Sequence, residues 1–202
     1  MRAAKLAAAA EALKRQSAVS PASGAAPFSL AFLTDARRAP HPLLVARALP
    51  RGAAVILRDY RLTGRAGLAA QLRAVCAPRG VRLIIGADAA LAGAVGADGV
   101  HWPRWHAPAA PAPEGMIVTA SCHNAEELAR AHAMGAALAL LSPAFATESH
   151  PGVEALGAER FCALAAASPL PVLALGGVDE NNAGRLAGRN VAGLAAISAF
   201  LA

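Results

Sequence analysis

The amino-acid sequence predicts an α/β fold, a single-domain (β/α)8 barrel of the TIM type. Short apolar runs alternate along the chain with stretches of helical periodicity, and the runs themselves are almost continuously apolar. Continuously apolar strands are expected where helices cover both faces of a parallel sheet. The 202 residues are enough for one well-buried core and few for two, so we expect one domain.

Eight apolar runs are the candidate strands, at residues 29–35, 53–59, 82–88, 98–102, 117–122, 137–143, 171–177 and 193–198. Helical periodicity separates them at residues 42–49, 66–77, 89–95, 125–134, 158–167 and 181–187. An open doubly wound sheet is the competing fold. The segment at the end of the first strand, LTDARRAP, lacks the glycines of a dinucleotide-binding turn, so a closed barrel is favoured.

Three segments depart from a regular barrel. Residues 1–27 are expected to form an N-terminal helix and a linker rich in Ser, Pro, Gly and Ala, and residues 28–202 the barrel. The proline-rich residues 102–116 leave no room for a helix, and the last helix is expected to be truncated. The N-terminal helix is expected to cover the surface that the missing last helix leaves open.

The charge of the chain suits an anionic partner, with a formal net charge of +6 and a pI of about 10.2. The 19 basic residues are scattered singly and in pairs, without the runs and interleaved aromatic residues of a nucleic-acid-binding surface. We therefore expect a phosphorylated small molecule and no nucleic acid. The oligomeric state is left open, and a homodimer is compatible with the sequence.

The three cysteines, Cys76, Cys122 and Cys162, are odd in number and widely spaced, so neither a disulfide framework nor a zinc ribbon is indicated. No apolar stretch reaches the roughly 18 residues that a membrane span needs. Glu11 and Lys14 interrupt the N-terminal alanine run too early for a secretory signal. We expect a cytoplasmic protein without membrane contact.

The loops that follow the last two strands are the first candidates for a ligand site. In (β/α)8 barrels these loops commonly bind phosphate through backbone N–H groups. Gly176 and Gly177 end the seventh candidate strand, and Ile197 and Ser198 end the eighth. The alternative for the glycine pair is an ordinary turn that requires positive φ angles.

The ends of two other strands offer groups that can hold an anion. Thr147, Ser149 and His150 follow the sixth strand and provide two hydroxyl groups and a titratable imidazole, although a plain surface loop is the alternative. Arg58 ends the second strand and is a candidate for a second anionic group.

The fifth strand ends with Ser121, and His123 follows it, where an imidazole can act as a general acid or base near neutral pH. His101 ends the fourth strand in a similar way, although single histidines are often structural. Metal binding by His101, His106, Cys122 and His123 is supported by neither an H-E-x-x-H motif nor paired-cysteine spacing. No metal site is predicted.

Five segments, taken in order, resemble successive motifs of the thiamine phosphate synthase/TenI family. They are ADGVHW (97–102), TASCHNAEELARAHAMGA (119–136), SPAFATESH (142–150), PVLALGGVDENNA (171–183) and GLAAISA (193–199). The resemblance covers about residues 28–200. It implies a TIM barrel and an enzyme of thiamine biosynthesis.

The resemblance implies one of two reactions. The synthase joins hydroxymethylpyrimidine pyrophosphate to thiazole phosphate, and Mg²⁺ assists the departure of pyrophosphate. TenI relatives bind the same thiazole phosphate and catalyse its tautomerisation, for which the S-x-H histidine, here His123, is the expected acid or base. The thiazole-phosphate positions of the family match at Gly176, Gly177, Ile197 and Ser198.

The chain departs from the family pattern at the pyrophosphate and Mg²⁺ end. Of the polar residues in the Q-L-R-x-K pattern expected after the second strand, only Arg58 is kept, and the Asn-Asp pair expected after the third strand is Gly86 and Ala87. The aspartate expected after the fourth strand is His106. Mg²⁺ prefers oxygen ligands in octahedral geometry, and the nearby Asp88 is the candidate to compensate.

Because these departures cluster in one half of the site, the sequence favours a TenI-like thiazole tautomerase with a degenerate pyrophosphate and Mg²⁺ site. Mg²⁺ is then expected as a cofactor only if synthase activity is retained. The alternatives are an active thiamine phosphate synthase and a non-catalytic barrel that binds a phosphate ligand. Another phosphosugar or indole-type barrel enzyme shares the fold and the phosphate turn.

Overall fold

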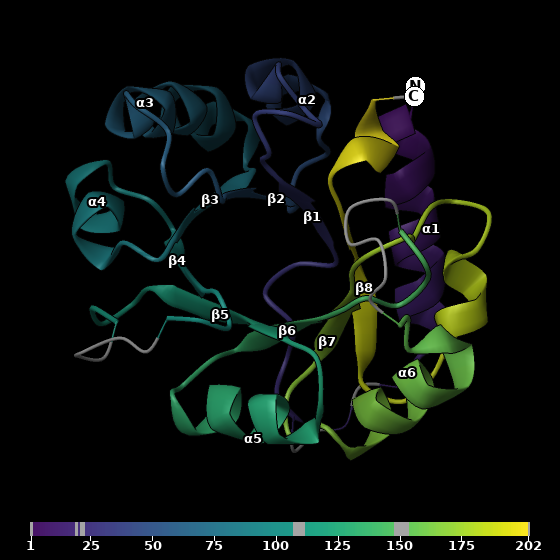
Figure 1. The fold of residues 1–202 in the computed structure, drawn as a ribbon. Helices are drawn as coiled ribbons and strands as arrows, with labels where there is room; N and C mark the ends of the chain where they lie inside the picture. The colour runs from purple at the N-terminus through teal and green to yellow at the C-terminus, as the bar shows by residue number, and fades with distance from the viewer. Residues whose placement is uncertain (1, 19, 21–22, 107–111, 148–153, 202) are drawn as a thin grey trace.

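A computed structural model describes residues 2–18, 20, 23–106, 112–147 and 154–201 of the chain. Eight parallel strands form a closed barrel in the order β1 to β8, and β8 pairs with β1 (Figure 1). The strands are β1 (Leu30–Leu33), β2 (Ala54–Leu57), β3 (Arg82–Gly86), β4 (Gly99–Trp102), β5 (Ile117–Cys122), β6 (Leu138–Leu141), β7 (Val172–Ala174) and β8 (Val191–Ala196). The predicted (β/α)8 barrel is therefore confirmed.

Helices form the outer layer of the barrel (Figure 1). They are α1 (Arg2–Gln16), α2 (Pro42–Ala48), α3 (Arg65–Cys76), α4 (Ala89–Ala94), α5 (Ala125–Ala133) and α6 (Gly157–Ala167), with short 3₁₀ helices η2 (Ala77–Arg79), η3 (Ala183–Leu186) and η4 (Ser198–Phe200). As predicted for the proline-rich segment, the described residues between β4 and β5 contain no helix. Among the described helices, none has both the length and the apolar character needed to cross a membrane.

The strands are buried along almost their whole length, which accounts for their continuously apolar sequence. Every residue of β1, β2, β4, β6, β7 and β8 is buried. One face of each strand packs inside the barrel and the other packs under the helices, so no alternation with polar residues is required.

Gly193 allows β8 to close against β1. Its φ angle is 146°, and a Cβ atom at this position would lie 1.9 Å from the carbonyl oxygen of Ser29. The next residue, Leu194, donates its N–H to that same oxygen at 3.0 Å. A larger side chain at position 193 would separate the two strands that close the barrel.

α1 runs alongside β8 and covers it (Figure 1). Ala3, Leu6, Ala10 and Leu13 are buried, and their spacing places them on one face of the helix. As expected, the N-terminal helix covers the outer side of the last strand.

Asn190 anchors the segment after α1 to the base of the barrel. This buried side chain accepts hydrogen bonds from the N–H of Ser20 at 2.8 Å and the hydroxyl of Ser23 at 3.2 Å. It also donates to the carbonyl oxygen of Ser168 at 3.0 Å. The segment expected as a plain linker therefore makes specific contacts with the barrel.

The prediction of an α-helix at residues 181–187 is wrong, because only the short 3₁₀ helix η3 forms there. Asp179 Oδ1 accepts from the N–H groups of Asn181 at 2.8 Å and Asn182 at 3.1 Å, and Asn182 Oδ1 accepts from the N–H of Asp179 at 3.0 Å. These side-chain bonds to the backbone fold the segment as a turn and compete with an α-helix.

Replacing Leu6 by Ala tests how strongly α1 is docked on the barrel. Leu6 is fully buried, so we expect the free energy of unfolding to fall by about 2–5 kcal/mol, measured by urea denaturation. The control is Lys5→Ala on the exposed face of the same helix, with an expected change within about 0.5 kcal/mol. Equal effects of the two substitutions would contradict a docked α1.

Candidate active site

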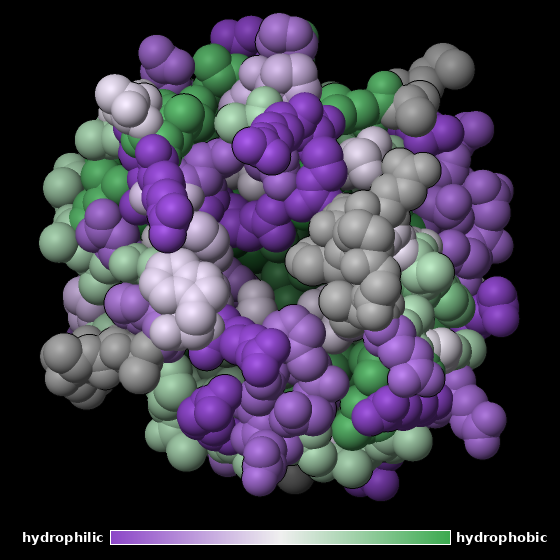
Figure 2. Space-filling view, in the orientation of Figure 1, coloured by the Kyte–Doolittle hydropathy of each residue, from purple (hydrophilic) through white to green (hydrophobic). Residues whose placement is uncertain are grey.

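A cavity of about 1460 Å³ opens at the end of the barrel where the strands finish. Figure 2 shows it as a hollow with an apolar floor and a largely hydrophilic rim. The apolar lining includes Leu33, Leu175 and Ile197. The polar lining comes from the ends of β1, β2, β4, β5 and β6, and consists of Asp35, Arg37, Arg38, Arg58, Asp59, Tyr60, Arg61, Arg104, Ser121, His123, Ser142 and Thr147. This is the end at which TIM barrels build active sites.

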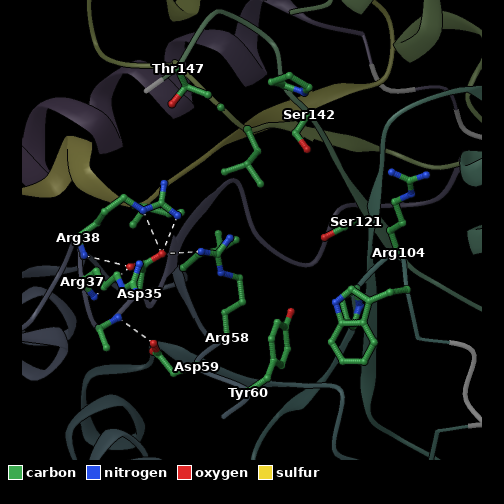
Figure 3. Close-up of a pocket in the computed structure, with 18 of the residues that line it drawn as sticks. Asp35, Arg37, Arg38, Arg58, Asp59, Tyr60, Arg104, Ser121, Ser142 and Thr147 are labelled. Carbon is green, nitrogen blue, oxygen red and sulfur yellow. Dashed lines mark hydrogen bonds and ion pairs between the residues drawn. The ribbon is translucent and has the colours of Figure 1, made fainter. Parts of the chain in front are cut away.

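Asp35 organises the guanidinium groups on one side of the cavity (Figure 3). Its Oδ2 accepts from Arg38 Nη2 at 2.6 Å and from Arg58 Nη2 at 2.7 Å, and its Oδ1 accepts from the N–H groups of Arg37 and Arg38. Burial alone would raise the pKa of this carboxyl, but the hydrogen bonds to Arg38 and the positive charges of Arg38 and Arg58 lower it to about 2. Asp35 therefore stays ionised and fixes both arginines.

His123 forms a dyad with Glu127, which lies one helical turn further along the chain. Glu127 Oε2 accepts hydrogen bonds at 2.8 Å from both Nδ1 and the backbone N–H of His123. Because a carboxylate only accepts, Nδ1 carries the hydrogen of this bond, and Nε2 is the ring nitrogen left for other partners. The buried Glu127 also pairs with Arg104 Nε at 3.2 Å.

The start of α5 explains why Glu127 lies there. The N-cap residue Asn124 accepts a hydrogen bond from the N–H of Glu127 at 2.9 Å, and acidic residues stabilise the first turn of a helix. The sequence carried a signal for this contact, because His123 directly precedes the N-cap residue of α5 and Glu127 is the third residue of that helix, from which a side chain can reach back to the N-terminal backbone. Glu127 was nevertheless not among the site residues predicted from the sequence.

His101 is structural, and it orients Ser121. Its Nδ1 lies 2.9 Å from Thr119 Oγ1 and its Nε2 lies 2.9 Å from Ser121 Oγ, while the Thr119 hydroxyl donates to the carbonyl of Val100. Thr119 therefore accepts from Nδ1–H, and Ser121 donates to Nε2. Burial, together with the positive charge of Arg58, lowers the pKa of His101 to about 3, so the ring is neutral.

The glycine pair forms a turn against the loop that follows β6. Gly176 and Gly177 have φ angles of 89° and 65°, and a Cβ atom at Gly177 would lie 2.5 Å from the carbonyl oxygen of Ala146. Within the described part of the chain, neither glycine N–H donates a hydrogen bond. Successive N–H groups in a turn of this kind can cradle an anion.

The structure brings most of the predicted site residues to one cavity. Arg58, Ser121, His123, Thr147, Gly176 and Ile197 line it. The neighbouring Gly177 and Ser198 are exposed but are not part of its lining. Ser149 and His150 lie outside the described residues.

The residues near the cavity do not fit the Mg²⁺ that the family resemblance implies. In the described ranges, no three or more His, Cys, Asp or Glu side chains are grouped so that they could hold a metal ion. Asp88 Oδ1 caps α4 by accepting from the N–H of Leu91 at 2.8 Å, and its Oδ2 pairs with Arg65 Nη1 at 3.4 Å. The His106 ring stacks on Trp102, with the ring centroids 5.0 Å apart. Asp88 is thus committed to the helix, and the described residues do not gather the oxygen ligands that Mg²⁺ prefers.

A closed (β/α)8 barrel with arginines and a glycine turn around its C-terminal cavity defines a barrel of the class that binds small phosphorylated ligands. Residues 30–200 match the family model described as thiamine monophosphate synthase. The chain therefore belongs to the thiamine monophosphate synthase family.

Individual relatives agree with this assignment. The chain is 38% identical over 178 residues to a thiamine-phosphate synthase of Chlorobium luteolum, covering 84% of each chain. It is 35% identical over 186 residues to a putative thiamine-phosphate synthase of Geobacter sulfurreducens, covering 87% of each. The solved structure of thiamine phosphate pyrophosphorylase from Pyrococcus furiosus matches with a TM-score of 0.71 and 26% identity, covering 84% of this chain and 85% of that one.

The buried neutral His101 predicts how stability depends on pH. Its pKa is lowered from 6.5 to about 3 in the folded protein, so below about pH 6.5 the unfolded chain binds a proton that the folded protein does not. Stability is therefore lost as the pH falls from about 6.5 towards 3. This single group contributes a slope of up to about 1.4 kcal/mol per pH unit.

We expect His101→Gln to have a shallower dependence of unfolding free energy on pH, measured by urea denaturation between about pH 6 and pH 4. The exposed His132 provides the control His132→Gln, which should keep the wild-type slope. An unchanged slope in His101→Gln would contradict a His101 that is neutral in the folded state.

Proposed function

We propose that this protein forms thiamine phosphate and pyrophosphate from hydroxymethylpyrimidine pyrophosphate and thiazole phosphate. The observation that carries the proposal is a cavity of about 1460 Å³ whose lining includes arginine side chains and the glycine turn. Ligand pockets usually measure about 300–1,000 Å³, so this one has room for two substrates. The names of the related proteins also favour the synthase over the tautomerase that the sequence favours.

The two sides of the cavity suit the two phosphorylated substrates. Arg38 and Arg58 follow β1 and β2, whereas Thr147 and Gly176 follow β6 and β7, and β2 and β6 are opposite each other in the closed eight-stranded barrel. Thiazole phosphate would bind at the glycine turn, and the pyrimidine pyrophosphate would direct its anionic group to the arginines. The apolar floor, which includes Ile197, would lie between them and exclude water.

In this arrangement the bond between the pyrimidine methylene carbon and a pyrophosphate oxygen breaks, and its electron pair leaves with pyrophosphate. The thiazole nitrogen uses its lone pair to form the new carbon–nitrogen bond. The guanidinium groups of Arg38 and Arg58 stabilise the charge that develops on the leaving group, because both are already held in place by Asp35.

Incubating the protein with both precursors should yield thiamine phosphate and pyrophosphate in equal amounts, quantified by chromatography. We expect Arg58→Gln to lower kcat/KM at least about tenfold, because a charge-assisted contact to the leaving group is lost. The control Arg47→Gln removes an exposed arginine of α2 and should leave kcat/KM unchanged. Absence of product above a protein-free control would refute the synthase.

The His123–Glu127 dyad favours tautomerisation of a thiazole phosphate as the second candidate function. Glu127 holds the neutral imidazole in one tautomer, which leaves Nε2 able to accept a proton at the cavity. The synthase mechanism above has no step that needs this base.

The tautomerase predicts that the protein interconverts thiazole phosphate tautomers, followed by NMR in deuterated water. His123→Gln should abolish the conversion while binding of thiazole phosphate is retained, and the exposed control His132→Gln should remain active. Binding of thiazole phosphate by the wild type with neither reaction would instead indicate a non-catalytic phosphate-binding barrel.

A further inference from the structure

The place where the family resemblance puts metal ligands is filled by an aromatic ring. A Cβ atom at Gly86 would lie 2.8 Å from Tyr60 Cε1 and 2.9 Å from the carbonyl oxygen of Leu57. The second contact is with backbone, which cannot move aside as the end of a side chain can. The Tyr60 ring therefore occupies space that is free only because residue 86 is glycine, and no amide or carboxylate side chain fits at position 86.

The aromatic contacts continue from the end of β2 to the end of β4. The Tyr60 and Trp105 rings meet edge to face with centroids 5.2 Å apart, and Trp105 meets His106 at 5.7 Å. Burial raises the pKa of Tyr60 to about 12, so its hydroxyl stays protonated at neutral pH and is a poor metal ligand. The rings of Tyr60, Trp105 and His106 thus form a continuous aromatic surface, the Tyr60–Trp105 wall, which offers no carboxylate oxygen.

Asp35 and Asp59, the described carboxylates that line the cavity, already accept hydrogen bonds. Asp35 accepts from Arg38 and Arg58, and Asp59 Oδ1 accepts from the N–H of Ala36 at 2.7 Å. A divalent cation would have to displace these donors and approach the neighbouring guanidinium groups. Like-charge repulsion and the lost hydrogen bonds both oppose that.

Arginine side chains supply positive charge to the cavity in place of a divalent cation. Among the described residues, five arginines and two aspartates line the cavity, an excess of three positive charges within that part of the lining. Arg104 follows β4, the strand after which the resemblance puts a metal ligand, and it lies across the cavity from Arg38 (Figure 3). Its side chain is 66% exposed, and its Nε pairs with Glu127.

We propose that the cavity binds the pyrophosphate group without a divalent cation, using Arg104 together with Arg38 and Arg58, beside the surface formed by Tyr60 and Trp105. The proposal rests on the proposed synthase function for its substrate. Guanidinium groups donate two parallel hydrogen bonds to phosphate oxygens, and their charge does not depend on pH in the physiological range. They can therefore take over the neutralisation of the leaving group that Mg²⁺ performs elsewhere in the family.

The first test compares formation of thiamine phosphate with EDTA and with saturating Mg²⁺. We expect the two rates to agree within about twofold, since the charges that stabilise the leaving group are covalently part of the chain. A loss of about tenfold or more in EDTA that Mg²⁺ restores would overturn the proposal while leaving the synthase function intact.

The second test titrates inorganic pyrophosphate into the full-length protein by calorimetry, and it does not depend on catalysis. We expect binding in EDTA and no heat from Mg²⁺ alone. Arg104→Gln should weaken the binding about tenfold, and Arg130→Gln, which removes an exposed arginine of α5, should not change it. The melting temperature of each variant checks that it is folded.

Binding of pyrophosphate only when Mg²⁺ is present, or no binding in either condition, would overturn the proposal. Metal-free binding of pyrophosphate without any thiamine phosphate formation would instead refute the synthase function and support the cationic pyrophosphate site. The two proposals therefore fail in different experiments.

Discussion

Hydrogen bonding between β1 and β8 closes the sheet, and the position of every loop around the cavity depends on that closure. Gly193 permits it, because a Cβ atom there would lie 1.9 Å from the carbonyl oxygen of Ser29. Once the parallel strands form a ring, all their C-terminal ends meet at one rim. Arg58, His123 and Gly176, which are far apart in sequence, then line the same cavity.

Within this rim, burial and ion pairing decide the charge of each group. Asp35 stays ionised because Arg38 and Arg58 donate to it, and His101 stays neutral because it is buried near Arg58. The ionised Asp35 keeps the two guanidinium groups in place, and the neutral His101 avoids an uncompensated charge inside the barrel. The result is a positively charged rim over an apolar floor, a setting in which an anionic substrate is attracted strongly.

The sequence predicted all eight strands, because burial on both faces gives them an apolar sequence that differs from their surroundings. It was wrong about a helix at residues 181–187, where Asp179 and Asn182 bond to the backbone of the same turn. It also omitted Glu127, although the four-residue spacing from His123 was a usable signal. No such signal existed for the contact between Tyr60 and Trp105, which are 45 positions apart and meet only in the folded barrel.

By itself the sequence determined the (β/α)8 barrel, the glycine turn at Gly176 and Gly177, and the absence of a carboxylate at Gly86, Ala87 and His106, where the family resemblance puts metal ligands, since each depends on local residue types and spacing. Tertiary structure alone decided what replaces those carboxylates. It showed that Asp88 is committed to capping α4 and that the Tyr60 ring occupies the space beside Gly86. The physical reason is that hydrogen bonding and steric fit depend on distances across the barrel, and these are set only when the sheet closes.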